Sequence, residues 1–249
     1  MANPFSNEVS CRVWAEKYRL TGPDGGAEAD IGESWTRIAR ALAAVEGRDR
    51  PLWESRFVDA LSDFRFLPGG RIQAGAGCGR EVTLFNCFVM GTIEDSLDGI
   101  FEALKQGAVT MQQGGGVGYD FSTLRPAGSR ARRSGATASG PVSFMRVWDG
   151  MCATLISGGN RRGAMMATLR CDHPDIEAFV NAKRNPRELR NFNLSVLVTD
   201  AFIEALHADA EWPLVFPVTG SDGAPADGDY TERAWPGAPT PLPCRIYRT

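Results

Sequence analysis

Two groups of residues in this sequence could carry chemistry, and the first is a single cysteine. Cys87 lies in the apolar run 83–90, TLFNCFVM, and a glycine block follows at 114–118. A thiol fixed in a strand beside glycine backbone can act as a nucleophile or redox group, because the glycines leave room for a ligand. Most buried cysteines are inert, since a free thiol packs as a small hydrophobic group. Whether Cys87 is a reactive or a packed thiol therefore depends on the residues around it.

The second group is a set of arginines in two loops that contain glycine. Four arginines, at 125, 130, 132 and 133, fall within nine residues, and Arg161 and Arg162 lie in the run 157–164, SGGNRRGA. Guanidinium groups make paired hydrogen bonds to phosphate oxygens, so either loop could bind a triphosphate. From the residues alone, a solvated charged loop is the commoner explanation of the first, and the second could be a simple anion-binding turn.

An amphipathic helix is predicted between these groups, over 95–113. Its apolar residues recur at helical spacing on one face. They are Leu97, Ile100, Phe101, Leu104, Ala108 and Met111. Asp95 or Ser96 would be the N-cap, because a side-chain oxygen at that position accepts a hydrogen bond from an otherwise unpaired helix N–H.

The remaining patterns predict a helical N-terminal region and then alternating strands and helices. Tryptophan and phenylalanine recur at helical spacing over 35–64, where they are expected to pack a core. Further along, strands near 83–90, 114–121 and 192–198 alternate with helices, which indicates an α/β fold. Gly, Pro, Asp and Ala dominate 219–243, so this stretch is predicted to be a long loop or a partly disordered connection. The predicted domains are 1–80, 81–218 and 219–249.

Bulk composition fits a soluble enzyme piece. The 249 residues, 43% of them hydrophobic, can bury a core. A net charge of −3 argues against a general nucleic-acid-binding surface. The first twenty residues mix charged and apolar positions, so neither a signal peptide nor a membrane span is predicted there, and a cytoplasmic location is expected.

The cysteine pattern favours reduced thiols and no metal site. The six cysteines include no C-x-x-C pair, and the histidine that lies near one of them is His173, close to Cys171. A zinc site or a disulfide scaffold is therefore not expected. In the run 172–177, DHPDIE, the proline and the apolar residues that follow it indicate the start of a helix.

Several of these segments, in order along the chain, resemble the large catalytic chain of ribonucleotide reductases. They are 84–90, 95–99, 112–119, 124–129, 140–148, 157–169 and 192–200. Three short sequences are most similar to the adenosylcobalamin-dependent branch, class II. They are NCF at 86–88, MQQGGG at 111–116 and RRGAMM at 161–166. The resemblance implies a small helical domain followed by a ten-stranded α/β barrel, of which this chain would supply the first half.

The same resemblance implies a radical reduction of ribonucleotides to deoxyribonucleotides for DNA synthesis. Cys87 would be one thiol of the redox pair, and Asn86, Gly116 and Arg161 would contact substrate. The family's radical cysteine and the second redox thiol would lie beyond Thr249, so the chain alone is expected to be inactive. The implied cofactor is adenosylcobalamin. The implied partners are a thioredoxin-like reductant and either a second copy of the chain or a second chain that completes the barrel. Neither a nucleic acid nor a membrane is expected as a partner.

Residues of both arginine loops and of the helix start match an allosteric site for a dNTP or ATP effector. By resemblance these residues are Asp95, Ser96, Arg125, Ser129, Arg132, Gly159, Asn160 and Arg162. The loop at 157–164 would lie between the effector and the substrate base, so that the effector selects the base that fits. An allosteric effect needs such an element, whose equilibrium both ligands bias.

Two alternatives remain open from the sequence. The chain could be a nucleotide-binding regulatory or partner subunit of a split or truncated reductase, which would need Asp95, Arg125 and Arg161 but not Cys87. It could also belong to the glycyl-radical or di-iron branch, which shares the fold. The sequence does not distinguish diphosphate from triphosphate substrates.

Overall fold

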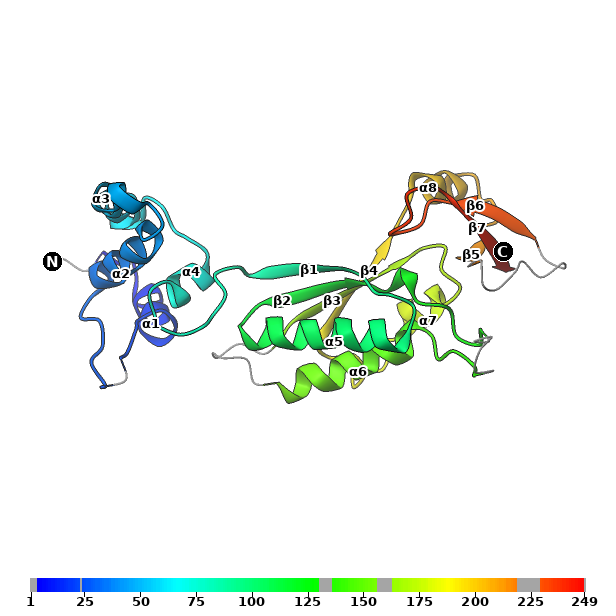
Figure 1. The fold of residues 1–249 in the computed structure, drawn as a ribbon, viewed down its shortest axis with the longest axis horizontal. Helices are drawn as coiled ribbons and strands as arrows, with labels where there is room; N and C mark the ends of the chain where they lie inside the picture. The colour runs from blue at the N-terminus through cyan, green and yellow to red at the C-terminus, as the bar shows by residue number, and fades with distance from the viewer. Residues whose placement is uncertain (1–3, 23, 130–135, 156–162, 219–228, 249) are drawn as a thin grey trace. The chain divides into compact units, whose positions relative to one another are not determined.

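The computed structural model describes residues 4–22, 24–129, 136–155, 163–218 and 229–248, and the chain divides into two compact units (Figure 1). The first unit comprises the chain up to Asn86 together with Gln113–Gly115. The second begins at Cys87 and contains the strands. No helix within the described residues is long and apolar enough to cross a membrane.

The first unit is built of helices and confirms the predicted helical N-terminal region. They are α1 (Glu8–Lys17), α2 (Ile31–Ala43), η1 (Gly47–Asp49), α3 (Arg50–Leu61), η2 (Ser62–Phe64) and α4 (Gly70–Gly75). Asn7 and Asp30 cap α1 and α2 by accepting hydrogen bonds from amides of the first turn. Ile38 and Leu61 bring α2 and α3 together in a small apolar core. The helix α4 forms although its sequence, GRIQAG, begins and ends with glycine.

The second unit contains a four-stranded sheet in which every neighbouring pair is parallel. Its strands, in spatial order, are β1 (Cys87–Thr92), β2 (Gly116–Asp120), β3 (Met165–Arg170) and β4 (Phe192–Leu197). The segments between successive strands contain α5 (Leu97–Gln112), η3 (Phe121–Thr123), α6 (Pro141–Thr154) and α7 (Ile176–Asn181). A parallel sheet joined by helical crossovers is the α/β architecture predicted, and it is consistent with part of an α/β barrel.

The two faces of this sheet differ. Helices α5 and α6 cover one face (Figure 1), and Met165, Ala167 and Leu169 alternate into the core beneath them. Residues on the other face are far more exposed, since Val89 keeps 94% of its accessible surface and Met166 keeps 41%. Because side chains alternate between faces along a strand, Cys87 lies on the same open face as Val89.

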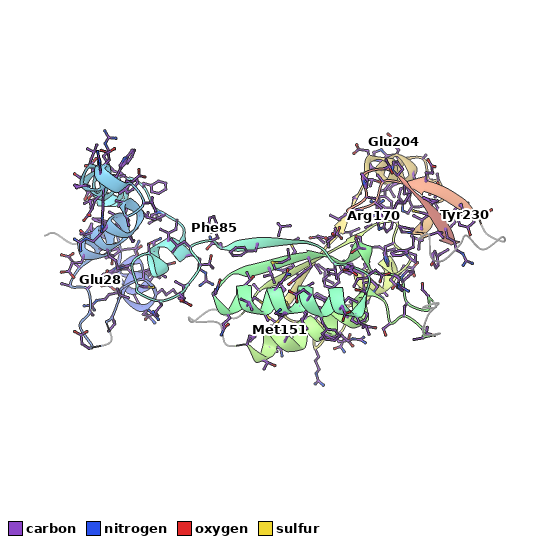
Figure 2. The ribbon with its side chains drawn as sticks, in the orientation of Figure 1. Glu28, Phe85, Met151, Arg170, Glu204 and Tyr230 are labelled. Atoms are coloured by element: carbon purple, nitrogen blue, oxygen red, sulfur yellow. The ribbon has the colours of Figure 1, made fainter. Side chains whose placement is uncertain are left out.

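A second, antiparallel sheet follows α8 (Asp200–His207). Its strands are β5 (Leu214–Pro217), β7 (Leu242–Arg248) and β6 (Tyr230–Arg233), in that spatial order. Figure 2 labels Arg170, at the end of β3, and Tyr230, the first residue of β6. The guanidinium of Arg170 stacks 4.7 Å from the ring centre of Trp235, which packs in the core of this small sheet.

The predicted loop or connection at 219–249 therefore contains two strands, and this part of the prediction differs from the structure. Leu242, Cys244 and Ile246 alternate along β7 and pack against Val215. The short strands were hidden in the sequence because Gly, Pro and Asp surround them. The domain boundaries at 80 and 218 stay a prediction.

Candidate functional site

Cys87 is the first residue of β1 and its side chain is exposed. The register pairs it with Gly116 on β2, and Val89 with Gly118. The neighbouring strand thus presents two residues without side chains next to the thiol, which leaves the open face of the sheet uncrowded there. Asn86 precedes the strand and is also exposed. Of the predicted substrate contacts, Arg161 lies outside the described residues.

The other five cysteines, all within the described residues, are less accessible than Cys87. Cys152, Cys171 and Cys244 are buried, and burial raises the pKa of each thiol, to about 11 for Cys244. A thiol with a raised pKa stays protonated near neutral pH and is a poor nucleophile. The three buried cysteines are packed groups, and Cys87 is the most exposed of the six thiols.

Asp95 and Arg125, two predicted effector residues thirty positions apart, are in direct contact. Arg125 Nε donates to Asp95 Oδ2 at 2.7 Å, and its backbone amide donates to Oδ1 at 3.2 Å. Arg125 Nη2 reaches the Asp95 carbonyl oxygen at 3.4 Å. The Arg125 side chain keeps 32% of its surface exposed and the Asp95 side chain keeps 27%, so a ligand could reach either group. A carboxylate can accept from a sugar hydroxyl, and a guanidinium can bind phosphate oxygens.

Neighbouring buried groups bring this pair together. The hydroxyl of Thr123 donates to the Ile93 carbonyl at 2.6 Å, two residues before each member of the pair. Ile93 and Leu124 are almost fully buried in the core of the second unit. The end of β1 and the end of η3 are thereby held side by side, and Asp95 and Arg125 emerge from them at the surface.

Ser96 caps α5, which settles the choice left open by the sequence. Its hydroxyl accepts from the Gly99 amide at 3.0 Å and donates to Glu94 Oε1 at 2.8 Å. The helix accordingly begins at Leu97 rather than at Asp95. With the cap provided by Ser96, the Asp95 carboxylate is available for Arg125.

Ser129 lies at the base of the first arginine loop. Its carbonyl accepts from the Ala138 amide at 2.7 Å, and the Gly128 amide donates to the Ala138 carbonyl at 2.9 Å. The Ser129 hydroxyl is buried and has no hydrogen-bond partner among the described residues. The other predicted effector residues, Arg132, Gly159, Asn160 and Arg162, lie outside the described residues.

Sequence reasoning missed two residues beside this loop, His173 and Asp175. His173 Nε2 lies 2.9 Å from the Leu124 carbonyl oxygen, and Nδ1 accepts from the Asp175 amide at 3.0 Å. Both ring nitrogens are therefore engaged by the protein, and α7 begins directly after Asp175, as predicted. Among the described residues, no group of three or more His, Cys, Asp or Glu side chains could hold a metal ion.

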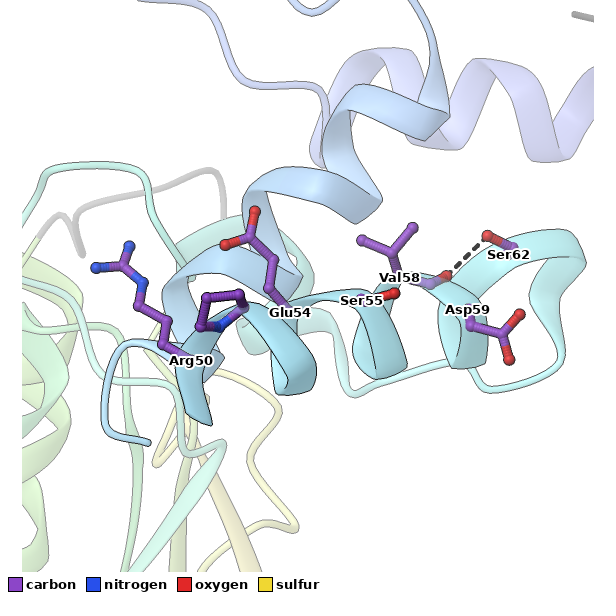
Figure 3. Close-up of a pocket in the computed structure, with 7 residues that line it drawn as sticks. Arg50, Glu54, Ser55, Val58, Asp59 and Ser62 are labelled. Carbon is purple, nitrogen blue, oxygen red and sulfur yellow. Dashed lines mark hydrogen bonds between the residues drawn. The ribbon is translucent and has the colours of Figure 1, made fainter. Parts of the chain in front are cut away.

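A surface pocket in the helical unit does not coincide with any predicted site residue (Figure 3). Its lining comes from a single helix and the residue after it, and comprises Arg50, Pro51, Glu54, Ser55, Val58, Asp59 and Ser62. The Ser62 hydroxyl donates a hydrogen bond to the Val58 carbonyl oxygen at 2.7 Å. We assign no ligand to this pocket.

Comparison with known families agrees with this architecture. The model of the ribonucleotide reductase barrel domain matches residues 85–234, and that of the all-alpha domain matches residues 5–81. This chain belongs to the ribonucleotide reductase large-subunit family. The resemblance found in the sequence is confirmed, and the two matched domains correspond to the helical unit and to the unit that contains the parallel sheet.

Individual relatives agree with the class II resemblance. A vitamin B12-dependent ribonucleoside-diphosphate reductase of Mycobacterium tuberculosis is 45% identical over 84% of this chain, and one of Thermoplasma acidophilum is 40% identical over 66%. A ribonucleoside-diphosphate reductase subunit alpha of Chlamydia pneumoniae is 27% identical over 74%. The matches cover 30%, 21% and 18% of these relatives, so the chain spans less than a third of each.

Proposed function

We propose that this chain is the part of a B12-dependent ribonucleotide reductase that carries one redox thiol and an effector-binding site. The observation that carries the proposal is the position of Cys87: an exposed thiol opposite Gly116, on the open face of a parallel sheet, in a chain of this family. The alternative, a nucleotide-binding partner subunit, would give that exposed thiol no role.

Cys87 would supply one of the two thiols that reduce the ribose. In the reaction the C2′–O bond breaks and the hydroxyl leaves as water, while two thiols give up two electrons and form a disulfide. A thioredoxin-like dithiol would then reduce this disulfide back to two thiols by thiol–disulfide exchange. By resemblance, the second thiol and the radical cysteine lie further along the family's chain than residue 249. We therefore expect no turnover from these 249 residues by themselves.

Adenosylcobalamin is the proposed cofactor, because relatives at 45% and 40% identity are named vitamin B12-dependent. When bound, it would supply the radical chemistry, and the protein would supply position and shielding. The described residues do not fit this group. Cys87 lies on an exposed strand, and the pocket on α3 is an open surface lined by one helix and the residue after it. We assign no cobalamin contact and derive no step through it.

The pair Asp95–Arg125 is the proposed core of the effector site. Asp95 would accept from the sugar of a deoxynucleotide, and Arg125 would bind its phosphates. Ser96 and Ser129 are close along the chain to these residues, and Arg132 and the loop 159–162 would complete the site. Asn86, Gly116 and Arg161 would contact the ribonucleotide substrate.

A second copy of the chain is the proposed partner at α5. This helix keeps Leu97, Phe101 and Val109 exposed at 64%, 51% and 49%, although its other side packs on the sheet. Apolar side chains gathered on an exposed helix face are typical of an interface. The alternative proposed partner is a second chain that completes the barrel, which would pair at the open edges of the sheet.

Complementation tests the function. The chain is mixed with a polypeptide that supplies the remaining part of the Mycobacterium tuberculosis relative, and with adenosylcobalamin, a dithiol and a ribonucleotide. We expect deoxyribonucleotide only in the complete mixture, and none when Cys87→Ser replaces the chain. Cys78→Ser, at a partly exposed cysteine of the helical unit, is the matched control. Full turnover by Cys87→Ser would overturn the assignment.

A further inference from the structure

The turn that precedes α7 contacts the segment around Arg125 on both sides of that arginine. His173 bonds the carbonyl of Leu124, the residue before Arg125, at 2.9 Å. The carboxylate of Asp175 accepts from the amide of Ala127, two residues after Arg125, at 2.8 Å. Because these contacts hold backbone atoms, they fix the path of the chain whatever the neighbouring side chains do.

The hydrogen bonds of His173 determine where its proton lies. Nδ1 accepts the Asp175 amide at 3.0 Å, so in the neutral ring the proton is on Nε2, which donates to the Leu124 carbonyl. The ring is fully buried, and burial lowers its pKa. A neutral, singly protonated ring satisfies both contacts at once.

The turn is itself held firmly, so it can act as a support. The Asp172 carboxylate accepts two hydrogen bonds from Arg170, at 2.8 and 2.7 Å, and its carbonyl accepts from Val215 of β5 at 2.6 Å. The His173 ring packs edge-on against Phe216, 5.5 Å between centres. Contacts to both sheets of the second unit thus converge on this turn.

Gly140, directly before α6, leaves space for the Asp175 contact. A Cβ atom at this position would lie 2.4 Å from Asp175 Oδ2 and 2.9 Å from the Ala127 amide nitrogen, and the backbone has a φ of +77°. Any other residue here would collide with this hydrogen bond. The close approach indicates that the loop base is packed tightly around the Asp175 carboxylate.

We infer that His173 and Asp175 are positioning residues of the nucleotide site, which hold Leu124–Ala127 so that Arg125 faces Asp95. They would act through the backbone and touch no ligand. The inference rests on the proposed nucleotide site at Asp95–Arg125. A residue that only stabilises the fold would change the melting temperature without changing nucleotide affinity, and this difference separates the two roles.

Equilibrium dialysis of the chain with each of the four dNTPs and Mg²⁺, alongside thermal melts, tests the inference. We expect Asp175→Ala to weaken binding about tenfold through the loss of one charge-assisted contact. Asp175→Asn keeps an acceptor oxygen and should bind within about threefold of the parent chain. If Asp175→Ala does not fold, Asp175→Ser, whose hydroxyl is too short to reach the Ala127 amide, takes its place.

Asp149→Ala is the matched control. Asp149 Oδ1 also accepts a backbone amide across the second unit, that of Asn191 at 2.9 Å, and within the described residues its side chain has no hydrogen bond to the segment around Arg125. We expect it to lower the melting temperature and leave the dissociation constant unchanged. In the Arg125→Ala background, Asp175→Ala should have no further effect on binding.

The outcomes separate the two proposals. If the parent chain binds a dNTP and Arg125→Ala weakens binding, but Asp175→Ala behaves like Asp149→Ala, the positioning role is wrong and the nucleotide site stands. An equal loss from Asp175→Ala with and without Arg125 would also overturn it. If the parent chain binds no dNTP, the proposed nucleotide site fails, and the positioning role fails with it.

Discussion

The two ends of β1 are built differently. At its start, Cys87 is exposed and faces a glycine on the next strand. Just beyond its end at Thr92, Asp95 sits in a network of hydrogen bonds with Arg125 and its neighbours. The strand separates the two regions by roughly 16 Å, at about 3.3 Å per residue. The proposed effector end is held by contacts between described residues, whereas the proposed redox role of Cys87 would need a second thiol.

The largest effect should be in thiol reactivity. Because burial raises its pKa to about 11, Cys244 carries roughly 0.1% thiolate at pH 8, and burial also restricts access of the reagent. We expect iodoacetamide at pH 8 to label Cys87 at least a hundredfold faster than Cys152, Cys171 or Cys244, as followed by peptide mass spectrometry. Comparable labelling of Cys87 and Cys244 in the folded chain would remove the distinction between the exposed thiol and the packed ones.

The second effect is a loss of stability in acid that depends on His173. Burial lowers its folded-state pKa, although the Leu124 carbonyl and the carboxylates of Asp175, Asp172 and Asp120 oppose this shift. The unfolded chain therefore binds a proton near the usual pKa of 6.5 while the folded chain does not. The free energy of unfolding should fall below pH 6.5, by up to about 1.4 kcal/mol per pH unit, until the folded-state pKa is reached.

Urea unfolding between pH 5 and 8 measures this dependence. His173→Gln, which retains a donor for the Leu124 carbonyl, should flatten the slope below pH 6.5. His207→Gln is the control, because His207 is the other histidine of the chain and is exposed. An unchanged slope in His173→Gln would show that another group titrates.

The smallest effect tests whether the effector end is held by its own contacts. Thr123→Val keeps the side-chain shape but removes the hydroxyl that donates to Ile93, so we expect a loss of about 1 kcal/mol in unfolding free energy. Thr110→Val, which removes an exposed hydroxyl on α5 that bonds the Gln106 carbonyl, should cost less. Equal costs for the two variants would argue that the Thr123 contact contributes nothing special to this region.

Sequence patterns predicted the elements better than the contacts between them. The apolar spacing of the helix after Asp95 and the alternation near Phe192 are local signals, and both elements form close to the predicted bounds. The role of His173 and Asp175 was not visible, because it depends on backbone atoms of Leu124 and Ala127 nearly fifty residues away. The local sequence does not reveal a contact partner this far along the chain.

The candidate site shows the same division. Family resemblance placed Asp95 and Arg125 in one site, but their direct contact was not predicted. Ser96 caps the helix because its short hydroxyl reaches the Gly99 amide. The strands β6 and β7 were missed because their apolar residues are few and are interrupted by turn residues. Tertiary packing against Val215 and Trp235 supplies what their local pattern lacks.

Deoxynucleotide binding by three forms of the chain tests the central claim most directly. We predict that the parent chain binds at least one dNTP, that Arg125→Ala weakens this binding at least about tenfold, and that Cys87→Ser leaves it unchanged. This result would show a nucleotide site that includes Arg125, near one end of β1, and that is independent of the thiol at the other end. Binding that survives Arg125→Ala, or is lost in Cys87→Ser, would contradict it.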